Sequence, residues 1–176
     1  MVGNSFADIF FKYITYLGDG VFAICISLII LFFNIRNGIL IFVSYALSGL
    51  ITSGMKNYFF DNVYRPFFVI DYFRGDLKLK LVDGVAMIGQ NSFPSGHATT
   101  AFAVFTAMAL MSDKGYMKII FLFTATLVAF SRTYLSQHWL VDIYFGSLIG
   151  LTSAMVLYFV VIKLEKLNRP LLLKRN

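Results

Sequence analysis

Long apolar runs limit what this chain can fold into more than any other feature of its sequence. Five of them cover about residues 21–33, 39–60, 96–112, 116–134 and 139–162. The 176 residues are 59% hydrophobic and only 14% charged, and the mean hydropathy is +0.76. A helix needs about 20 apolar residues to cross a hydrocarbon core, where backbone polar groups must be paired. The runs therefore predict an all-α fold: a polytopic membrane helix bundle of about five transmembrane helices, in one domain over residues 1–176.

An apolar segment precedes the first run. Residues 5–17 carry Asp8 and Lys12 near one helical face, but about 13 residues are too few to cross a bilayer. The segment has no cleavage site of the kind that ends a signal peptide. We expect an N-terminal amphipathic helix in the membrane interface, ending at residues 18–20. The alternative is that it joins the next run as one long kinked span.

Residues 61–92 form the only sizeable polar segment and are expected to be an outer loop. Within it, residues 77–82 alternate apolar and basic side chains and are followed by Asp83-Gly84. Because such alternation before Asp-Gly is typical of a hairpin, the loop is predicted to carry a short β-hairpin on the membrane surface. The basic residues Arg74, Lys78 and Lys80 could contact an anionic headgroup, or could form a solvated basic face near anionic lipid.

Charge predicts the orientation of the bundle. The turns after the first and third runs and the C-terminal tail fall on one side of the membrane. They carry eight basic residues against Asp113 and Glu165. Because cytoplasmic loops of membrane proteins are rich in lysine and arginine, this side is predicted to be cytoplasmic. The basic residues are Arg36, Lys114, Lys118, Lys163, Lys166, Arg169, Lys174 and Arg175.

The same composition excludes other classes of partner and site. The formal charge of +6 does not indicate nucleic acid binding, because no basic stripe with interleaved aromatic residues is present. Cys25 is the only cysteine, so neither an internal disulfide nor a thiolate metal site is expected. Membrane lipids are the expected surroundings, and no obligate protein partner is evident.

The chemistry-bearing residues fall in three segments that the predicted topology brings to the outer face. The second segment, Pro94-Ser95-Gly96-His97, ends in one of the two histidines of the chain. Proline followed by a good N-cap predicts that a helix begins at residue 96, and its free N–H groups suit a phosphate. The first segment contains Lys56, Arg65 and Pro66, and the third contains Ser131, Arg132, His138 and Asp142.

Together these residues suit phosphoryl transfer. Three cations and free N–H groups stabilise a phosphate and the extra charge of its transition state. Asp142 lies four residues after His138, so on a helix it can hold one imidazole nitrogen and leave the other free to attack. The second histidine, His97, can then protonate the leaving oxygen. Two histidines and one aspartate could also bind a metal, but the crowd of positive charge favours an anion.

Each element also has a purely structural interpretation. A His-x-x-x-Asp pair is usually a structural hydrogen bond, Pro-Ser-Gly-His is usually a turn with a helix cap, and Lys56 or Arg132 could anchor a helix end. The structural interpretation fails for the set as a whole, because both histidines and all these cations fall on one side beside a helix N-terminus.

The three segments resemble the signature of the type 2 phosphatidic acid phosphatases, the PAP2 superfamily. That signature is Lys-x6-Arg-Pro, Pro-Ser-Gly-His and Ser-Arg-x5-His-x3-Asp. The second motif is intact at 94–97 and the third at 131–142, whereas the first has eight residues between Lys56 and Arg65. The resemblance implies that His138 is the nucleophile, Asp142 orients it and His97 is the general acid. It further implies that no metal or other cofactor is needed, and that the phosphate is held by Lys56, Arg65, Ser95, Gly96 and Arg132.

The resemblance also implies a substrate class and a location. We expect a metal-independent phosphatase in a bacterial inner membrane, with its site facing the periplasm or the outside. The expected substrate is a lipid phosphate or pyrophosphate in the outer leaflet. Lipid A 1-phosphate is favoured, and undecaprenyl pyrophosphate and phosphatidylglycerol phosphate are the other candidates. A lipid phosphotransferase and a non-catalytic transporter or scaffold are the alternatives. The related vanadium haloperoxidases are soluble, which the apolar runs contradict.

Overall fold

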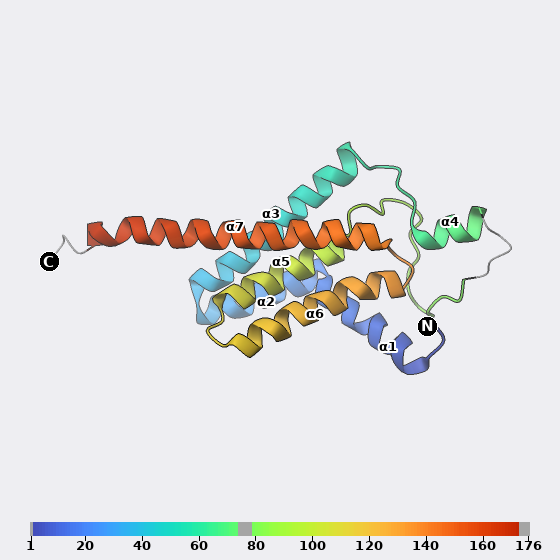
Figure 1. The fold of residues 1–176 in the computed structure, drawn as a ribbon, viewed down its shortest axis with the longest axis horizontal. Helices are drawn as coiled ribbons and strands as arrows, with labels where there is room; N and C mark the ends of the chain where they lie inside the picture. Colours follow the sequence, from blue (N-terminus) through green and yellow to red (C-terminus); the bar gives the residue numbers. More distant parts are fainter. Residues whose placement is uncertain (1, 74–78, 173–176) are drawn as a thin grey trace.

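The computed structural model describes residues 2–73 and 79–172, with side chains up to residue 164, and it is helical at every apolar run (Figure 1). The all-α prediction is confirmed, because no strand occurs in these residues. The elements are α1 (Ser5–Ile14), the 3-10 helix η1 (Thr15–Gly18), α2 (Gly20–Phe33), α3 (Ile35–Tyr58), α4 (Pro66–Phe73), α5 (Gly96–Met111), α6 (Gly115–Tyr134) and α7 (Leu140–Leu172).

Polar side chains start four of these helices. Asn4, Asp19, Asn34 and Ser95 each have extended backbone and accept a hydrogen bond from an N–H group of the first helical turn. An N-cap of this kind satisfies a backbone donor that has no partner inside the helix. The cap predicted at Ser95 is confirmed, since its hydroxyl accepts from the N–H of Ala98 at 3.5 Å. The sequence therefore places the start of α5 at residue 96.

The short helix α5 occupies the centre of the bundle. It packs mainly against α7, α6 and α3, and most of its side chains are buried, many of them alanines. The small residues Gly146 and Gly150 of α7 make this close approach possible. A Cβ atom added at Gly146 would lie 2.6 Å from the carbonyl oxygen of Ser95, and one at Gly150 would meet the backbone of Thr99. Small residues therefore let α7 lie directly on the backbone of α5.

Length separates the helices into two groups. Three of those described, α3, α6 and α7 over Leu140–Leu164, are long and apolar enough to cross a membrane. The segments Ser5–Gly18 and Gly20–Phe33 form a pair bent by 59°, which is the geometry of a broken span or a re-entrant loop and matches the alternative of a kinked span. The 16-residue α5 is shorter than the roughly 20 residues of a full crossing. The total of five spans therefore stays a prediction.

The predicted β-hairpin is wrong. Residues 77 and 78 lie outside the described part of the chain, and residues 79–92 form a loop without strands. The turn at Asp83-Gly84 is present, and Gly84 has a φ of +72°, but the two arms beside it do not pair. The residues that follow the later arm bond to the segment before α4: Arg65 donates its N–H to the carbonyl oxygen of Gly89, and the N–H of Ser92 donates to that of Val63. Alternation alone did not reveal these contacts. The helix α4 within the same segment was not predicted.

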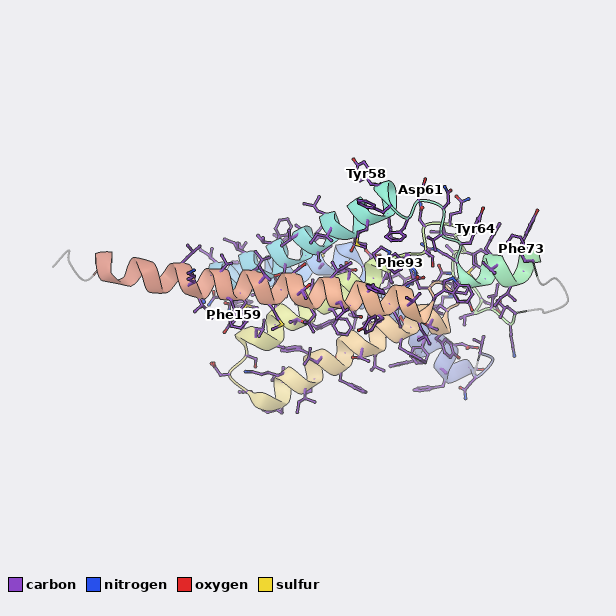
Figure 2. The ribbon with its side chains drawn as sticks, turned by 45° about the horizontal axis from the view of Figure 1, so that its top comes forward. Tyr58, Asp61, Tyr64, Phe73, Phe93 and Phe159 are labelled. Atoms are coloured by element: carbon purple, nitrogen blue, oxygen red, sulfur yellow. The ribbon has the colours of Figure 1, made fainter. Side chains whose placement is uncertain are left out.

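The two ends of the bundle are formed by different elements. The α2–α3 turn, the α5–α6 turn and the end of α7 lie at one end, and α1, α4 and the α6–α7 loop lie at the other (Figure 1). Aromatic side chains are exposed near this second end, including Tyr58 at 84% and Phe73 at 65% (Figure 2). Tyrosine and other aromatic residues are frequent at membrane–water boundaries. The end that holds α1 and α4 is called the loop end below.

Candidate functional site

A chain of hydrogen bonds joins the three predicted segments at the loop end. Lys56 Nζ donates to the carbonyl oxygen of Asn91 at 2.9 Å. The N–H of Ser95 donates to the carbonyl oxygen of Asp142 at 3.0 Å, and the N–H of His138 donates to that of Arg132 at 3.2 Å. These contacts link α3, the start of α5, the end of α6 and the start of α7. Residues up to 86 positions apart in sequence therefore share one site.

The His138–Asp142 pair is buried, with exposed fractions of 2% and 1%. His138 Nδ1 lies 3.4 Å from Asp142 Oδ2. The same oxygen accepts from the N–H of Trp139 at 2.9 Å and from the hydroxyl of Ser92. The sequence predicts that the two side chains share one face of a helix. This prediction is wrong, because His138 lies in the loop before α7. Asp142 instead reaches back from the first turn of α7, an arrangement that leaves Nε2 of His138 as the nitrogen for attack.

The N-terminus of α5 offers backbone donors to an anion. The N–H of Thr99 bonds to the carbonyl oxygen of Ser95, so the N–H groups of Gly96 and His97 precede the first bond of the helix. A Cβ atom added at Gly96 would meet nothing within 4 Å, so the space beside this backbone is open. Ser95 uses its own hydroxyl as the helix cap. The start of α5 thus has the features of an anion-binding helix N-terminus.

Three cations surround this helix start and are anchored by neutral acceptors. Arg65 donates from Nε to the oxygen of Gln90 and from Nη1 to Gln137 Oε1, both at 2.9 Å. Arg132 Nη1 donates to the hydroxyl of Thr15 at 2.9 Å, while its buried Nε has no partner. Within the described residues, no carboxylate forms an ion pair with Lys56, Arg65 or Arg132. Buried charge without a counter-charge is costly, so the arrangement favours an anionic ligand.

The unusual spacing of Lys56 and Arg65 is accommodated by the loop between them. Helix α3 continues to Tyr58, and residues 59–65 then turn back so that Arg65 immediately precedes α4. Lys56 lies in the last turn of α3 and reaches across to Asn91. The two extra residues therefore do not separate Lys56 from the rest of the site.

Sequence reasoning missed several residues that position the site. Ser92 is fully buried and donates its hydroxyl to Asp142. Gln137 is 1% exposed; its Oε1 accepts from Arg65 and its Nε2 donates to the carbonyl oxygen of Ala86. Thr15 comes from the predicted interfacial helix and Gly18 from the turn predicted to end it, yet Thr15 bonds to Arg132 and Gly18 lies against the backbone of His97. The position of Gln137 next to His138 was the one local signal, because a polar residue beside a buried histidine needs a partner.

The pKa of the His138 imidazole is lowered to about 4, mainly by burial. The hydrogen bond to Asp142 raises this pKa, whereas the nearby cations of Arg65, Arg132 and Lys56 lower it. A lowered pKa means that the ring is neutral at every pH above about 4. A neutral imidazole has a lone pair on one nitrogen, which a nucleophile needs. Burial likewise lowers the pKa of Arg65.

We expect ¹⁵N NMR to show this neutral ring directly. In a His97→Gln variant labelled with ¹⁵N-histidine, produced without a histidine tag and held in detergent micelles, His138 is the only histidine. Its nitrogen signals should remain those of a neutral ring at pH 5.5 and titrate with a midpoint near 4. In the denatured chain the midpoint should return to about 6.5. A folded midpoint at that ordinary value would contradict the buried, cation-surrounded position of the ring.

The site can therefore bind a phosphate, attack it with a neutral histidine and exchange a proton through a second histidine. No group of three or more histidine, cysteine, aspartate or glutamate side chains that could hold a metal ion occurs in the part of the chain that the structure describes. The charge at the site comes from lysine and arginine side chains, which bind anions.

Comparisons with known proteins found a matching family model and similar solved structures. A family model described as the PAP2 superfamily matches residues 37–166. Aquifex aeolicus LpxE has a similar crystal structure, with a TM-score of 0.74 and 24% identity over 89% of this chain and 88% of that one. The crystal structure of the first transmembrane PAP2 type phosphatidylglycerolphosphate phosphatase from Bacillus subtilis is also similar. Its TM-score is 0.74, and the identity is 24% over 92% of this chain and 80% of that one. No significant match was found among curated protein sequences.

Proposed function

Because this chain belongs to the PAP2 superfamily and is a membrane-embedded phosphatase of that superfamily, we propose that it removes the terminal phosphate of a membrane lipid through a phosphohistidine formed on His138. The observation that carries the proposal is a set of three cations around a neutral histidine. Among the described residues none of the three cations forms an ion pair with a carboxylate, and the buried Nε of Arg132 has no hydrogen-bond partner.

The reaction has two half-reactions. In the first, the Nε2 lone pair of His138 attacks phosphorus, the P–O bond to the lipid breaks, and His97 gives its proton to the leaving oxygen. In the second, a water molecule attacks phosphorus, the N–P bond breaks, and His97 takes a proton from the water. Lys56, Arg65, Arg132 and the N–H groups at the start of α5 stabilise the charge that develops on the phosphoryl oxygens.

For the substrate we propose a lipid with a terminal phosphate, with lipid A 1-phosphate first. Two similar structures carry the names LpxE and phosphatidylglycerolphosphate phosphatase, and these names support testing both a glycolipid and a glycerolipid phosphate. Undecaprenyl pyrophosphate is the third candidate. Of the basic loop residues considered for the headgroup, Arg74 and Lys78 lie outside the described residues, and Lys80 lies in the loop before the Asp83-Gly84 turn.

A phosphate-release panel tests the function. Purified protein in detergent is given each of the three candidate lipids and phosphatidic acid, with EDTA present, and free phosphate is measured. Release from at least one lipid that is lost in His138→Ala supports the proposal. Release that needs added Mg²⁺ or Zn²⁺ would contradict the metal-independent mechanism. A phosphotransferase would release phosphate only slowly and would label an added lipid or sugar hydroxyl instead. A transporter or scaffold would show no difference between His138→Ala and the unmodified chain.

We further propose that the loop end faces the periplasm or the outside of a bacterial inner membrane. In a Cys25→Ala background, a cysteine at Ile88 should react with a membrane-impermeant thiol reagent on intact spheroplasts. A cysteine at Lys114, in the α5–α6 turn, should react only after the membrane is opened. Ile88 is 56% exposed and Lys114 is exposed, so accessibility to the reagent depends on the side of the membrane. The reverse labelling would place the site in the cytoplasm.

A further inference from the structure

Two separate clefts reach the site, and they share a single lining residue, His97. The first, here called the α3 cleft, has a volume of about 290 Å³ and is lined mainly by the α3 face from Tyr45 to Lys56, by residues 18–20 and by the start of α5. The second, here called the loop cleft, has a volume of about 210 Å³ and is lined by Lys12, Thr15, Tyr16, Arg132, Leu135, Gln137 and four residues of the 84–88 loop.

The reaction needs two routes to one position. In an in-line displacement the leaving oxygen departs from the side of phosphorus opposite Nε2 of His138. The water of the second half-reaction must attack from this same side, because it displaces that nitrogen. Both oxygens also exchange a proton with His97. The two oxygens nevertheless come from different surroundings, since the lipid alcohol is tied to the bilayer and water is not.

The α3 cleft has the position that a lipid requires. It follows α3 from Lys56 down to Tyr45, a distance of about 16 Å at 1.5 Å per residue. α3 is one of the helices long and apolar enough to cross the membrane, so the cleft extends into the depth of the bilayer. Its wall carries the small residues Gly18, Gly20 and Gly49 and the hydroxyls of Tyr45, Thr52 and Ser53, which fit a polar headgroup with its linking alcohol.

The loop cleft has the opposite character. None of its lining residues comes from α2, α3 or α7, and apart from His97 its walls are α1, η1, the end of α6, the residues that follow it and the outer loop. It carries the cations Lys12 and Arg132, and the ammonium of Lys12 donates to the carbonyl oxygen of Asp83 at 2.7 Å. Its volume suits a phosphate ion with a few waters, at about 30 Å³ per water, but not a lipid.

We propose that the two clefts divide the reaction: the lipid alcohol leaves along the α3 cleft, and the loop cleft supplies the water and releases phosphate. His97 lies between them and carries the proton from one half-reaction to the other. This inference rests on the proposed function. It follows that filling the α3 cleft slows formation of the phosphoenzyme, whereas filling the loop cleft slows its hydrolysis.

Single substitutions can fill each cleft separately. A Cβ atom at Gly49 would meet nothing within 4 Å, so Gly49→Leu places its side chain in the α3 cleft. Gly54→Leu is the matched control, because Gly54 is equally open on the same helix and lines neither cleft. Ala86→Trp fills the loop cleft from an exposed loop position, and Ile88→Trp is a second variant of the same kind. Leu81→Trp, in the same loop but outside both clefts, is its control.

Rapid-quench kinetics with a ³²P-labelled lipid phosphate separate the two steps. In Ala86→Trp and Ile88→Trp we expect the burst of lipid alcohol to keep its rate, steady turnover to fall about tenfold or more, and phosphoenzyme to accumulate. In Gly49→Leu the burst itself should be slower than in Gly54→Leu by about tenfold or more, without accumulation of phosphoenzyme.

The opposite pattern overturns the assignment. If loop-cleft variants slow the burst, or Gly49→Leu accumulates phosphoenzyme, the routes are reversed; if all three cleft variants behave like their controls, the clefts are not routes at all. Thermal unfolding of each variant and its control shows whether a loss of activity is due to misfolding. The rate of phosphoenzyme formation relative to that of its hydrolysis does not depend on the fraction of active enzyme. Failure of the proposed function is distinct, because the unmodified chain would then release no phosphate.

Discussion

His138→Ala is expected to abolish both turnover and the covalent phosphoenzyme, whereas His97→Ala should lose only part of the rate. Without His138 no atom accepts the phosphoryl group, and the neighbouring Asp142 and Ser92 are buried behind the ring position. Without His97 the nucleophile remains, and the loss is that of general acid catalysis, about 10²–10⁴-fold. This corresponds to about 3–5 kcal/mol in the barrier. Steady-state rates and trapping of ³²P-phosphoenzyme at alkaline pH measure the two effects.

The leaving group separates the two histidines further. A nitrophenolate needs no proton to depart, whereas an alkoxide does, so His97→Ala should recover on p-nitrophenyl phosphate relative to an alkyl phosphate. His138→Ala should not recover on either substrate. Equal losses on both substrates for both variants, or a missing phosphoenzyme in His97→Ala, would show that the roles are assigned wrongly.

Gly150→Leu should disable the enzyme from a position inside the bundle. A Cβ atom there already meets the backbone of Thr99 and Ala103, neither of which can move without shifting α5. The larger side chain must push α7 away from α5, at a cost of about 3 kcal/mol in the free energy of unfolding. Because Asp142 at the start of α7 bonds to Ser95 at the start of α5, the same shift disturbs the site.

A displacement of about 1 Å at a reacting group costs about 10²-fold in rate, so Gly150→Leu should lose at least about that much activity. Thermal unfolding in detergent and phosphate release measure the two effects. Gly54→Leu makes the same chemical change at a glycine with open space around it, and should keep both stability and rate. Unchanged unfolding and activity in Gly150→Leu would mean that α7 does not rest on α5 as described.

The sequence by itself determined the helices of the apolar runs, their order and the start of the central one, but not α4. Helix formation uses hydrogen bonds between residues four apart, so apolar runs and caps such as Ser95 carry the information locally. The spacing of Gly146 and Gly150 favours a close helix contact, although it does not identify the partner helix. The three motif segments identified the candidate reactive residues, and the order of the helices alone predicted that they lie at one end of the bundle.

Only the tertiary structure decided how the loops pair and what holds each reactive side chain. The predicted hairpin is absent, and residues 89–92, which follow it, bond to Val63 and Arg65 in the segment before α4. Arg132 bonds to Thr15, 117 residues away, and Arg65 bonds to Gln137, 72 residues away. The two clefts that meet at His97 likewise combine segments from distant parts of the chain. Such contacts depend on how packed helices bring loop backbone and long side chains together, and no local pattern records that geometry.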